Sequence, residues 1–217
     1  MESYRNLKIL QNLYRLQSLG FEYSDMIQPS CTSHAMANDI DSLKKEIQSC
    51  CLCDFSKSAT QSMSGYGSSD ADILFLDYSV SELEDLHNSY YCGRSGEILK
   101  NMIQNVLGLS IEEVFFTHAI KCKPLSFQKK YPTQFQSCQG YLRSQIKLIK
   151  PKVVVALGEE SYNALFPDGA PFKDIRGHIL EYDSIKVVAI YHPSYILRNP
   201  NLKKIAFYDL KTIKSCL

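Results

Sequence analysis

The sequence predicts an α/β protein with a mostly parallel sheet that is covered by helices on both faces. From Asp72 onward, short apolar runs alternate with segments of helical periodicity, and this alternation is typical of such sheets. The apolar runs are strand-sized and far shorter than the ~20 residues that cross a bilayer. Hydrophobic residues make up 45% and charged residues 22% of the 217 residues, which excludes the collagenous, mucin-like and wholly disordered classes.

The N-terminal part is expected to be a helix followed by a linker. Residues 4–19 place leucines at helical spacing, and Gly20 ends the pattern. Residues 20–38 are rich in Ser and isolated polar residues, as a loosely packed connection is. A second, short helix is expected over 39–49, directly before a group of cysteines. We therefore divide the chain into an N-terminal helix and linker, 1–38, and one domain, 39–217.

Strands and helices then alternate to the end of the sequence. Strands are expected at the apolar runs 73–76, 114–120, 153–157 and 185–190. Helices are expected over 95–107, 133–150, 159–165 and 201–214. Because parallel sheets bind ligands at the carboxyl ends of their strands, functional residues are expected shortly after residues 76, 120, 157 and 190.

Charge is distributed unevenly along the chain, although the net charge is only +1. Residues 1–97 hold 7 basic and 14 acidic side chains, whereas residues 121–152 hold 8 basic side chains and no acidic one. Residues 198–217 add 5 basic side chains against 1 acidic side chain. Two basic segments in a nearly neutral chain indicate an anion-binding face, with an ordinary solvated lysine-rich surface as the alternative.

The cysteines are expected to form a metal site. The first residues carry charges where a signal peptide would be apolar, so the protein is expected in the cytoplasm, where thiols stay reduced. Cys50 and Cys53 form a Cys-x2-Cys pair, and Cys122 and Cys138 form a wider pair. Four thiolates suit zinc or an iron–sulfur cluster, and the wide second pair favours [4Fe-4S] over zinc. Buried structural thiols are the remaining interpretation, and Cys51 competes with Cys50 as a ligand.

Seven short motifs follow one another between residues 50 and 198. They are Cys50-Cys-Leu-Cys53, Gly93-Arg-Ser-Gly96, Lys121-Cys-Lys-Pro124, Cys138-Gln-Gly-Tyr-Leu142, Lys150-Pro-Lys-Val-Val-Val-Ala-Leu-Gly158, Arg176-Gly177 and His192-Pro-Ser-Tyr-Ile-Leu-Arg198. Their order and spacing resemble those of family 4 uracil-DNA glycosylases over roughly residues 40–215. The resemblance implies a three-layer sandwich with a four-stranded parallel sheet. It also implies a [4Fe-4S] cluster bound by Cys50, Cys53, Cys122 and Cys138.

The same resemblance implies an activity in base-excision repair. Enzymes of this family bind DNA, flip one nucleotide into a pocket and hydrolyse the N-glycosidic bond of uracil or another deaminated base. DNA, single- or double-stranded, is thus the expected partner of a monomeric enzyme, with repair proteins as further partners. By resemblance, His192 stabilises the anionic base as it leaves. Ser194, Arg198, Lys129 and Lys130 are expected to contact DNA.

The first catalytic motif of the family is replaced in this chain. Where the family has Gly-Glu-Ala-Pro-Gly, the sequence reads Asp77-Tyr78-Ser79-Val80-Ser81. Asp77 is the carboxylate nearest to the lost motif and is the candidate for activating water, and Tyr78 is expected at the base pocket. Tyr91 replaces the Phe that stacks on the base, and His118 replaces the Asn that reads the edge of uracil.

These replacements leave three hypotheses. The first is a working DNA N-glycosylase with altered base selectivity. The second is a catalytically inactive member of the family that binds DNA or a repair partner. The third is a redox or cluster-sensing regulator, suggested by Cys51 and Cys92 near the ligand and pocket segments. The strength of the motif pattern favours the first.

Overall fold

The computed structural model describes residues 10–11, 14–15, 17–18, 37–125 and 130–217. The chain separates into two compact units, 1–32 and 33–217. In the first unit all described residues are helical, and the Ser18 hydroxyl donates a hydrogen bond to the Arg15 carbonyl at 2.8 Å. These residues fall within the helix expected over 4–19, whereas the expected linker lies outside the described residues up to position 36. Among the described helices, none has the length and apolar character of a membrane span.

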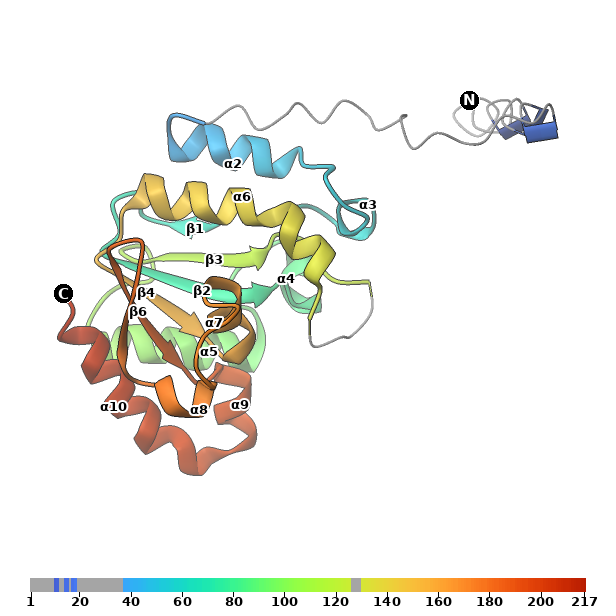
Figure 1. Cartoon of the computed structure of the whole chain (residues 1–217). Helices are drawn as coiled ribbons and strands as arrows, with labels where there is room; N and C mark the ends of the chain where they lie inside the picture. Colours follow the sequence, from blue (N-terminus) through green and yellow to red (C-terminus); the bar gives the residue numbers. More distant parts are fainter. Residues whose placement is uncertain (1–9, 12–13, 16, 19–36, 126–129) are drawn as a thin grey trace. The chain divides into compact units, whose positions relative to one another are not determined.

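The second unit is built around a sheet whose six strands run in the order β1-β3-β2-β4-β6-β5 (Figure 1). They are β1 (Tyr66–Gly67), β2 (Ile73–Ser79), β3 (Phe115–Ile120), β4 (Val153–Leu157), β5 (Ile179–Tyr182) and β6 (Ile185–Ile190). The central strands β3, β2, β4 and β6 are parallel, and β1 and β5 pair antiparallel at the edges. The α/β class is confirmed, whereas the expected number of four strands is wrong.

The two edge strands carry no signal that sequence reasoning could use. β1 has only two residues, and β5 alternates exposed and half-buried positions without a continuous apolar run. Strands β3 and β4 are buried at every position, which explains why they read as continuous apolar runs. Strand β2 extends beyond its expected end at residue 76, because Asp77 and Ser79 still pair with β3. This extension brings Asp77 into the sheet itself.

Helices cover both faces of the sheet (Figure 1). They are α2 (Ile40–Gln48), α3 (Phe55–Ser58), α4 (Glu82–His87), α5 (Gly93–Met102), α6 (Pro132–Ile149), α7 (Glu159–Leu165), α8 (Phe172–Ile175), α9 (Pro193–Arg198) and α10 (Lys203–Lys214). Leu43 of α2 and Leu142 of α6 pack in one core with Leu74 of β2, and Leu99 of α5 and Leu210 of α10 belong to the core on the other face. The fold is therefore a three-layer sandwich.

All five helices expected in this unit are present with slightly shifted ends. The helix expected over 95–107 is α5, which continues as a π-helical turn over Ile103–Leu107 and stops at Gly108 in the left-handed conformation. A 3-10 turn, Pro200–Leu202, precedes α10. Helices α4 and α9 were not expected, because each has only six residues and shows too little periodicity. Both of these short helices carry residues of the candidate site.

Candidate functional site

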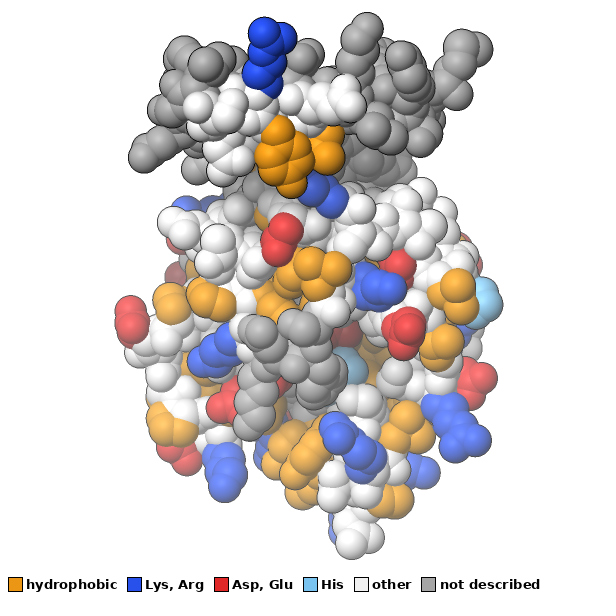
Figure 2. Space-filling view, turned by 90° about the vertical axis from the view of Figure 1, so that its right-hand side faces the viewer, with side chains coloured by type: hydrophobic (Ala, Val, Ile, Leu, Met, Phe, Trp, Pro, Cys, Tyr) orange, Lys and Arg blue, Asp and Glu red, His pale blue; other side chains and the backbone are white. Residues whose placement is uncertain are grey.

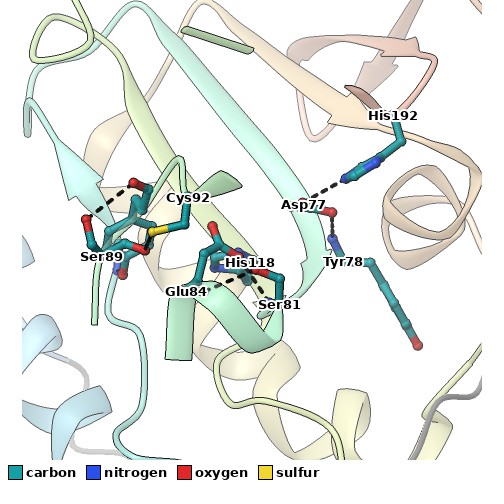
Figure 3. Close-up of polar contacts among 10 residues, drawn as sticks. Asp77, Tyr78, Ser81, Glu84, Ser89, Cys92, His118 and His192 are labelled. Atoms are coloured by element: carbon teal, nitrogen blue, oxygen red, sulfur yellow. Dashed lines mark hydrogen bonds and ion pairs between the residues drawn. The ribbon is translucent and has the colours of Figure 1, made fainter. Parts of the chain in front are cut away.

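Asp77 and His192 meet at the carboxyl ends of two strands. Asp77 lies near the end of β2, and His192 follows β6 and is the N-cap residue of α9. The Nε2 atom of His192 is 3.0 Å from Oδ2 of Asp77 (Figure 3). Their side chains are 29% and 19% exposed, respectively, so a ligand can reach the pair from solvent. The structure thus brings together two candidate residues that are far apart in the sequence.

Local hydrogen bonds fix the orientation of this pair. The backbone N–H of Ser194 donates to Nδ1 of His192 at 3.1 Å, and the Ser194 hydroxyl lies 2.7 Å from the same nitrogen. An Nδ1 atom that accepts this bond carries no proton, so the neutral ring carries its proton on Nε2 and donates it to Asp77. The second carboxylate oxygen of Asp77, Oδ1, accepts the backbone N–H of Tyr78 at 2.6 Å.

The two side chains of the pair shift each other's pKa in opposite directions. Burial raises the pKa of Asp77, but the charge and hydrogen bond of His192, the charge of His118 and the backbone N–H of Tyr78 together lower it by more, so the net shift is downward. Burial lowers the pKa of His192, but the charge and hydrogen bond of Asp77, together with the charges of Glu160 and Glu84, raise it by more, so the net shift is upward. At neutral pH the structure therefore holds a carboxylate next to a histidine that is more easily protonated than usual.

A second histidine–carboxylate pair lies beside the first. His118 on β3 stands next to Asp77 in the register of the sheet, and its Nε2 atom is 3.3 Å from Oε2 of Glu84 on α4 (Figure 3). These side chains are 0% and 8% exposed. Glu84 also accepts the backbone N–H of Ser81 at 3.0 Å in a capping box that starts α4. Neither ring nitrogen of His118 has a well-aligned hydrogen-bond partner among the described residues, and Nε2 faces the Glu84 carboxylate.

Tyr90 is the aromatic residue that lies against His118. Its ring stacks on the His118 ring with centroids 5.8 Å apart, and on Tyr66 with centroids 5.9 Å apart. Its hydroxyl accepts the backbone N–H of Gly65 at 2.6 Å. Tyr90 also lines a cavity of about 360 Å³ to which Asp77, His118 and His192 do not contribute. We place the candidate site at the polar groups, because the cavity holds none of the paired carboxylates and histidines.

The structure separates Tyr91 and Tyr78 from the two polar pairs. Tyr91 is 4% exposed and packs on the Phe116 ring, with centroids 4.9 Å apart. Tyr78 points away from Asp77 and stacks on Tyr131, whose backbone N–H donates to its hydroxyl at 2.9 Å (Figure 3). Neighbouring residues of a strand point to opposite faces of the sheet, which explains why the side chains of Tyr78 and Asp77 point in different directions. The placement of Tyr78 and Tyr91 favours packing roles over the expected contacts with a base.

The four candidate metal-ligating cysteines come from three separate parts of the fold. Cys50 and Cys53 lie between α2 and α3, Cys122 follows β3, and Cys138 lies in α6. Burial raises the pKa of Cys122 to about 12, and the charges of the other three thiols raise it further. Burial likewise raises the pKa of Cys138 to about 11, with Cys53 and Cys50 adding to the shift. Cys122 and Cys138 are therefore each influenced by thiols from other parts of the fold.

The surroundings of the thiols suit a metal group. The Ser62 hydroxyl lies 3.2 Å from Sγ of Cys122, and backbone N–H groups of Phe55 and Ser56 donate to Cys53. Such donors stabilise sulfur atoms that carry negative charge. Buried thiols of this kind become thiolates when a cation binds them. Within the described residues, no three His, Cys, Asp or Glu side chains converge on a single metal-ion position.

The expected DNA contacts are partly described. Arg198 is exposed at the end of α9, and Lys130 is exposed directly before α6. Ser194 is half-buried, and its hydroxyl bonds to the His192 ring. Lys129 lies outside the described residues.

Three residues near the candidate sites were missed by sequence reasoning. Glu84 lies in a segment with no expected helix, and Tyr90 was passed over for its neighbour Tyr91. Lys121 is 1% exposed, and its Nζ donates to Oε1 of Gln145 at 2.6 Å and to Oγ1 of Thr117 at 2.8 Å. Burial lowers the pKa of Lys121 to about 7, although the nearby thiols raise it. Its position directly before Cys122 in a recognised motif was the signal that could have identified it.

Comparisons with known proteins identify the family of the chain. The family model of the uracil DNA glycosylase superfamily matches residues 64–211. The type-4 uracil-DNA glycosylase of Sulfurisphaera tokodaii is 31% identical over 185 residues, which is 82% of this chain and 84% of the relative. The type-4 enzyme of Archaeoglobus fulgidus is 31% identical, over 80% of this chain and 91% of the relative. That of Thermotoga maritima is 29% identical, over 80% of this chain and 92% of the relative.

The region matched by the family model contains both histidine–carboxylate pairs as well as Cys122 and Cys138. The alignments with the three relatives cover most of the length of each relative. From the family match and these identities, the chain belongs to the uracil-DNA glycosylase superfamily.

Proposed function

We propose that this protein is a DNA N-glycosylase that hydrolyses the bond between deoxyribose and uracil, or another deaminated base, flipped out of DNA. The observation that carries the proposal is the Asp77–His192 pair at the carboxyl ends of β2 and β6, 3.0 Å apart and open to solvent. A carboxylate can activate water, and a histidine donor can stabilise the departing base. The type-4 uracil-DNA glycosylases among the relatives support uracil as the first base to test.

His192 acts on the leaving base. Breaking the N-glycosidic bond leaves negative charge on the base, and a histidine donor directed at a base carbonyl stabilises that charge. Nε2 carries the donated proton, because Nδ1 accepts the backbone N–H of Ser194. Without DNA this proton is directed to Asp77. We infer that it turns to the base when the base enters, as catalytic hydrogen bonds often form only in the complex.

Asp77 acts on the sugar and on water. A carboxylate offers about four lone-pair positions, and the described contacts, from His192 and the backbone of Tyr78, use two of them. Once His192 turns to the base, Asp77 binds a water molecule and takes a proton from it. The water oxygen then bonds to the anomeric carbon, and the electron pair of the broken bond leaves with the base. The negative charge of Asp77 also stabilises the cationic sugar before water attacks.

His118 is placed to read the base. It is next to Asp77 in the sheet, and its ring nitrogens are buried without an aligned partner. The Glu84 carboxylate favours a proton on the Nε2 atom that faces it, which leaves Nδ1 as an acceptor. Tyr90, stacked on His118, supplies the nearest aromatic surface and must shift to admit a base. The proposed selectivity therefore depends on a histidine and a tyrosine instead of an asparagine and a phenylalanine.

Four cysteines are proposed to hold a [4Fe-4S] cluster, with zinc as the less favoured alternative. Cys50 and Cys53 are half-buried and Cys122 and Cys138 are buried, and four thiols that influence one another in this way are a donor set that fits the cluster. When bound, the cluster supplies a rigid crosslink. Its cysteine ligands would join the segment after α2, the end of β3 and α6, and would thereby hold the first basic segment in place. Iron and sulfide content of protein purified without oxygen tests this assignment, with Cys122→Ser expected to lose iron and Cys216→Ser, a buried thiol outside the set, expected to keep it.

The proposed activity is tested by base release from end-labelled DNA with a single uracil, hypoxanthine or xanthine, in single- and double-stranded form. We expect release that falls about 100- to 1,000-fold in His192→Ala. The control is His87→Ala, which removes an exposed histidine from α4. Absence of release from every substrate by the iron-loaded protein would contradict the proposal, and DNA binding that persists would then favour the inactive, DNA-binding alternative. Sedimentation of the same sample tests the expected monomer.

A further inference from the structure

The C-terminal helix α10 presents a solvent face that the proposed active site does not use. Its exposed residues are mostly basic or aromatic along the first three turns. We call this surface the α10 face and define it by five residues, Lys203, Lys204, Phe207, Tyr208 and Lys211. The opposite side of the helix is buried through Ala206, Leu210 and Ile213, so the exposed side is not a packing surface of this domain.

The lysines of the α10 face have no acidic counterpart nearby in sequence. Between residues 193 and 217 Asp209 is the sole acidic side chain. Asp209 is buried and is bonded to Arg176, so its charge is already compensated within the domain. The α10 face is therefore positively charged, as a surface that binds a polyanion is.

Two aromatic rings lie among these lysines. Phe207 is 42% and Tyr208 56% exposed, and their ring centroids are 6.2 Å apart. The Nζ atom of Lys211 lies 4.8 Å from the centroid of the Phe207 ring. Exposed aromatic rings within a basic surface are typical of proteins that bind single-stranded nucleic acid, because the faces of unpaired bases can stack on them. In a duplex these faces are hidden, so the rings would contribute little there.

The α10 face is connected to the candidate active site through helix α9 and the turn that follows it. Helix α9 begins directly after His192 and exposes Tyr195 and Arg198, and the turn Pro200–Leu202 contacts both α9 and α10. Figure 2 shows Lys and Arg side chains next to hydrophobic ones at the lower end of the molecule, where Figure 1 places α9 and the start of α10. The 12 residues of α10 span about 18 Å, the length of about five nucleotides of a stacked strand.

We infer that the α10 face binds the single-stranded DNA that flanks the flipped nucleotide. Lysines contact the phosphates, and Phe207 and Tyr208 stack on unpaired bases. The inference rests on the proposed function, because it takes the position of the flipped nucleotide from His192. It goes beyond that function by assigning a second DNA-contacting surface and a preference for unpaired flanks.

The test measures DNA affinity of the full-length protein by fluorescence anisotropy. The probes are a uracil-containing single strand with flanks of about ten nucleotides, the same strand cut close to uracil, and the matching duplex. We expect Phe207→Ala with Tyr208→Ala to raise Kd for the long single strand at least about fivefold, with no change for the short strand or the duplex. Lys203→Glu with Lys204→Glu should weaken binding of both long probes and reduce the salt dependence. Lys214→Glu, at the far end of α10, serves as the matched control.

Three outcomes would overturn the inference. The first is an unchanged Kd for the long single strand in the aromatic variant, and the second is an equal loss for single strand and duplex in that same variant. The third is loss of self-association in sedimentation instead of loss of DNA affinity. The last result would make the α10 face an interface between copies of the chain. Base release from the short strand, measured in parallel, reports on the proposed function separately. If no base is released but the flank effect is present, the proposed function fails and the α10 face remains a DNA-binding surface.

Discussion

Two histidine–carboxylate pairs lie next to each other at the carboxyl ends of the parallel strands, and they differ in their exposure to solvent. His192 and Asp77 are 29% and 19% exposed, whereas His118 and Glu84 are 0% and 8% exposed. His192 begins a helix and is held through backbone contacts of its own turn, while His118 lies inside a strand and is flanked by aromatic rings. The Asp77–His192 pair is thus open to substrate and water, whereas the Glu84–His118 pair is enclosed by protein.

This difference separates chemistry from recognition. A catalytic pair must exchange protons with water and substrate in each reaction cycle, so partial exposure suits Asp77 and His192. A pair that selects a base must keep one orientation, so burial suits Glu84 and His118. Variants in the two pairs should therefore affect different measurements.

The largest effect is expected for Asp77→Asn. The amide keeps the size of the side chain but removes the negative charge, so it can neither take a proton from water nor stabilise a cationic sugar. We expect kcat for base release to fall about 100-fold or more. Single-turnover measurements with excess enzyme would show the loss in the chemical step, with DNA affinity retained.

Asp72→Asn is the matched control for this change. Asp72 lies just before the other end of β2 and pairs with Lys152 on the surface, where both side chains are more than half exposed. The control variant should release base at the normal rate. A rise in the rate of Asp77→Asn above that of the unchanged protein would show that Asp77 only masks His192, and would remove Asp77 from the mechanism.

A smaller effect, on stability instead of rate, is expected for Glu84→Gln. Glutamine preserves the capping bonds to Ser81 but removes the charge that faces His118. We expect the free energy of unfolding to fall by about 1–3 kcal/mol, as measured by denaturant titration. The exposed Glu82→Gln on the same helix should leave it unchanged. A rate loss as large as that of Asp77→Asn, with normal stability, would instead place Glu84 in the chemistry.

The fold could be predicted from the sequence wherever burial leaves a continuous pattern. Strands β3 and β4 are buried at every position and were found as apolar runs, and the long helix α6 was found from its periodicity. The short elements β1, α4 and α9 were not found, because their positions depend on pairing and packing with distant residues. The same limit applies to the candidate site.

Asp77 and His192 were identified because each stands at a motif position. Glu84 and Tyr90 were not, because their importance comes from what they face across the fold: His118 lies 34 residues beyond Glu84 in sequence and meets it through packing of α4 on the sheet. Tyr78 was expected at the pocket because it lies in the segment that replaces the first catalytic motif, whereas in the structure its side chain lies on the opposite face of the strand from Asp77 and stacks on Tyr131. Sequence patterns indicate roughly where a strand ends. To tell which way a side chain at that end points, one must know how far the strand extends.

The comparison can be sharpened at His118. His118→Asn introduces a donor and an acceptor on one amide, which match the adjacent N3–H and O4 of uracil. We expect the ratio of kcat/KM for uracil over hypoxanthine to rise about tenfold. The measurement is paired single-base release assays, with Ser110→Asn, on a half-buried loop away from the site, as control. An unchanged ratio would mean that His118 does not contact the base.

The smallest effect concerns pH and separates the accessible pair from the buried one. Asp77 has a pKa below its ordinary value of 3.8, so its pairing stabilises the fold above pH 3.8 and is lost as the pH falls below that value. His192 has a pKa above its ordinary value of 6.5, so its contribution is complete below pH 6.5 and is lost as the pH rises through the raised pKa. The pair therefore stabilises the fold most between about pH 4 and 6.5.

Asp77→Asn should accordingly lower the free energy of unfolding most within this window and least above it. Denaturant titrations of both proteins at pH 5, 7 and 9 measure the difference directly. If the difference is the same at every pH, the bond between Asp77 and His192 contributes as a neutral hydrogen bond, and the proton on Nε2 is held too firmly to be turned toward a base. A difference that shrinks as the pH rises shows instead that His192 gains and loses a proton in the folded protein, which is what stabilising a departing anion requires.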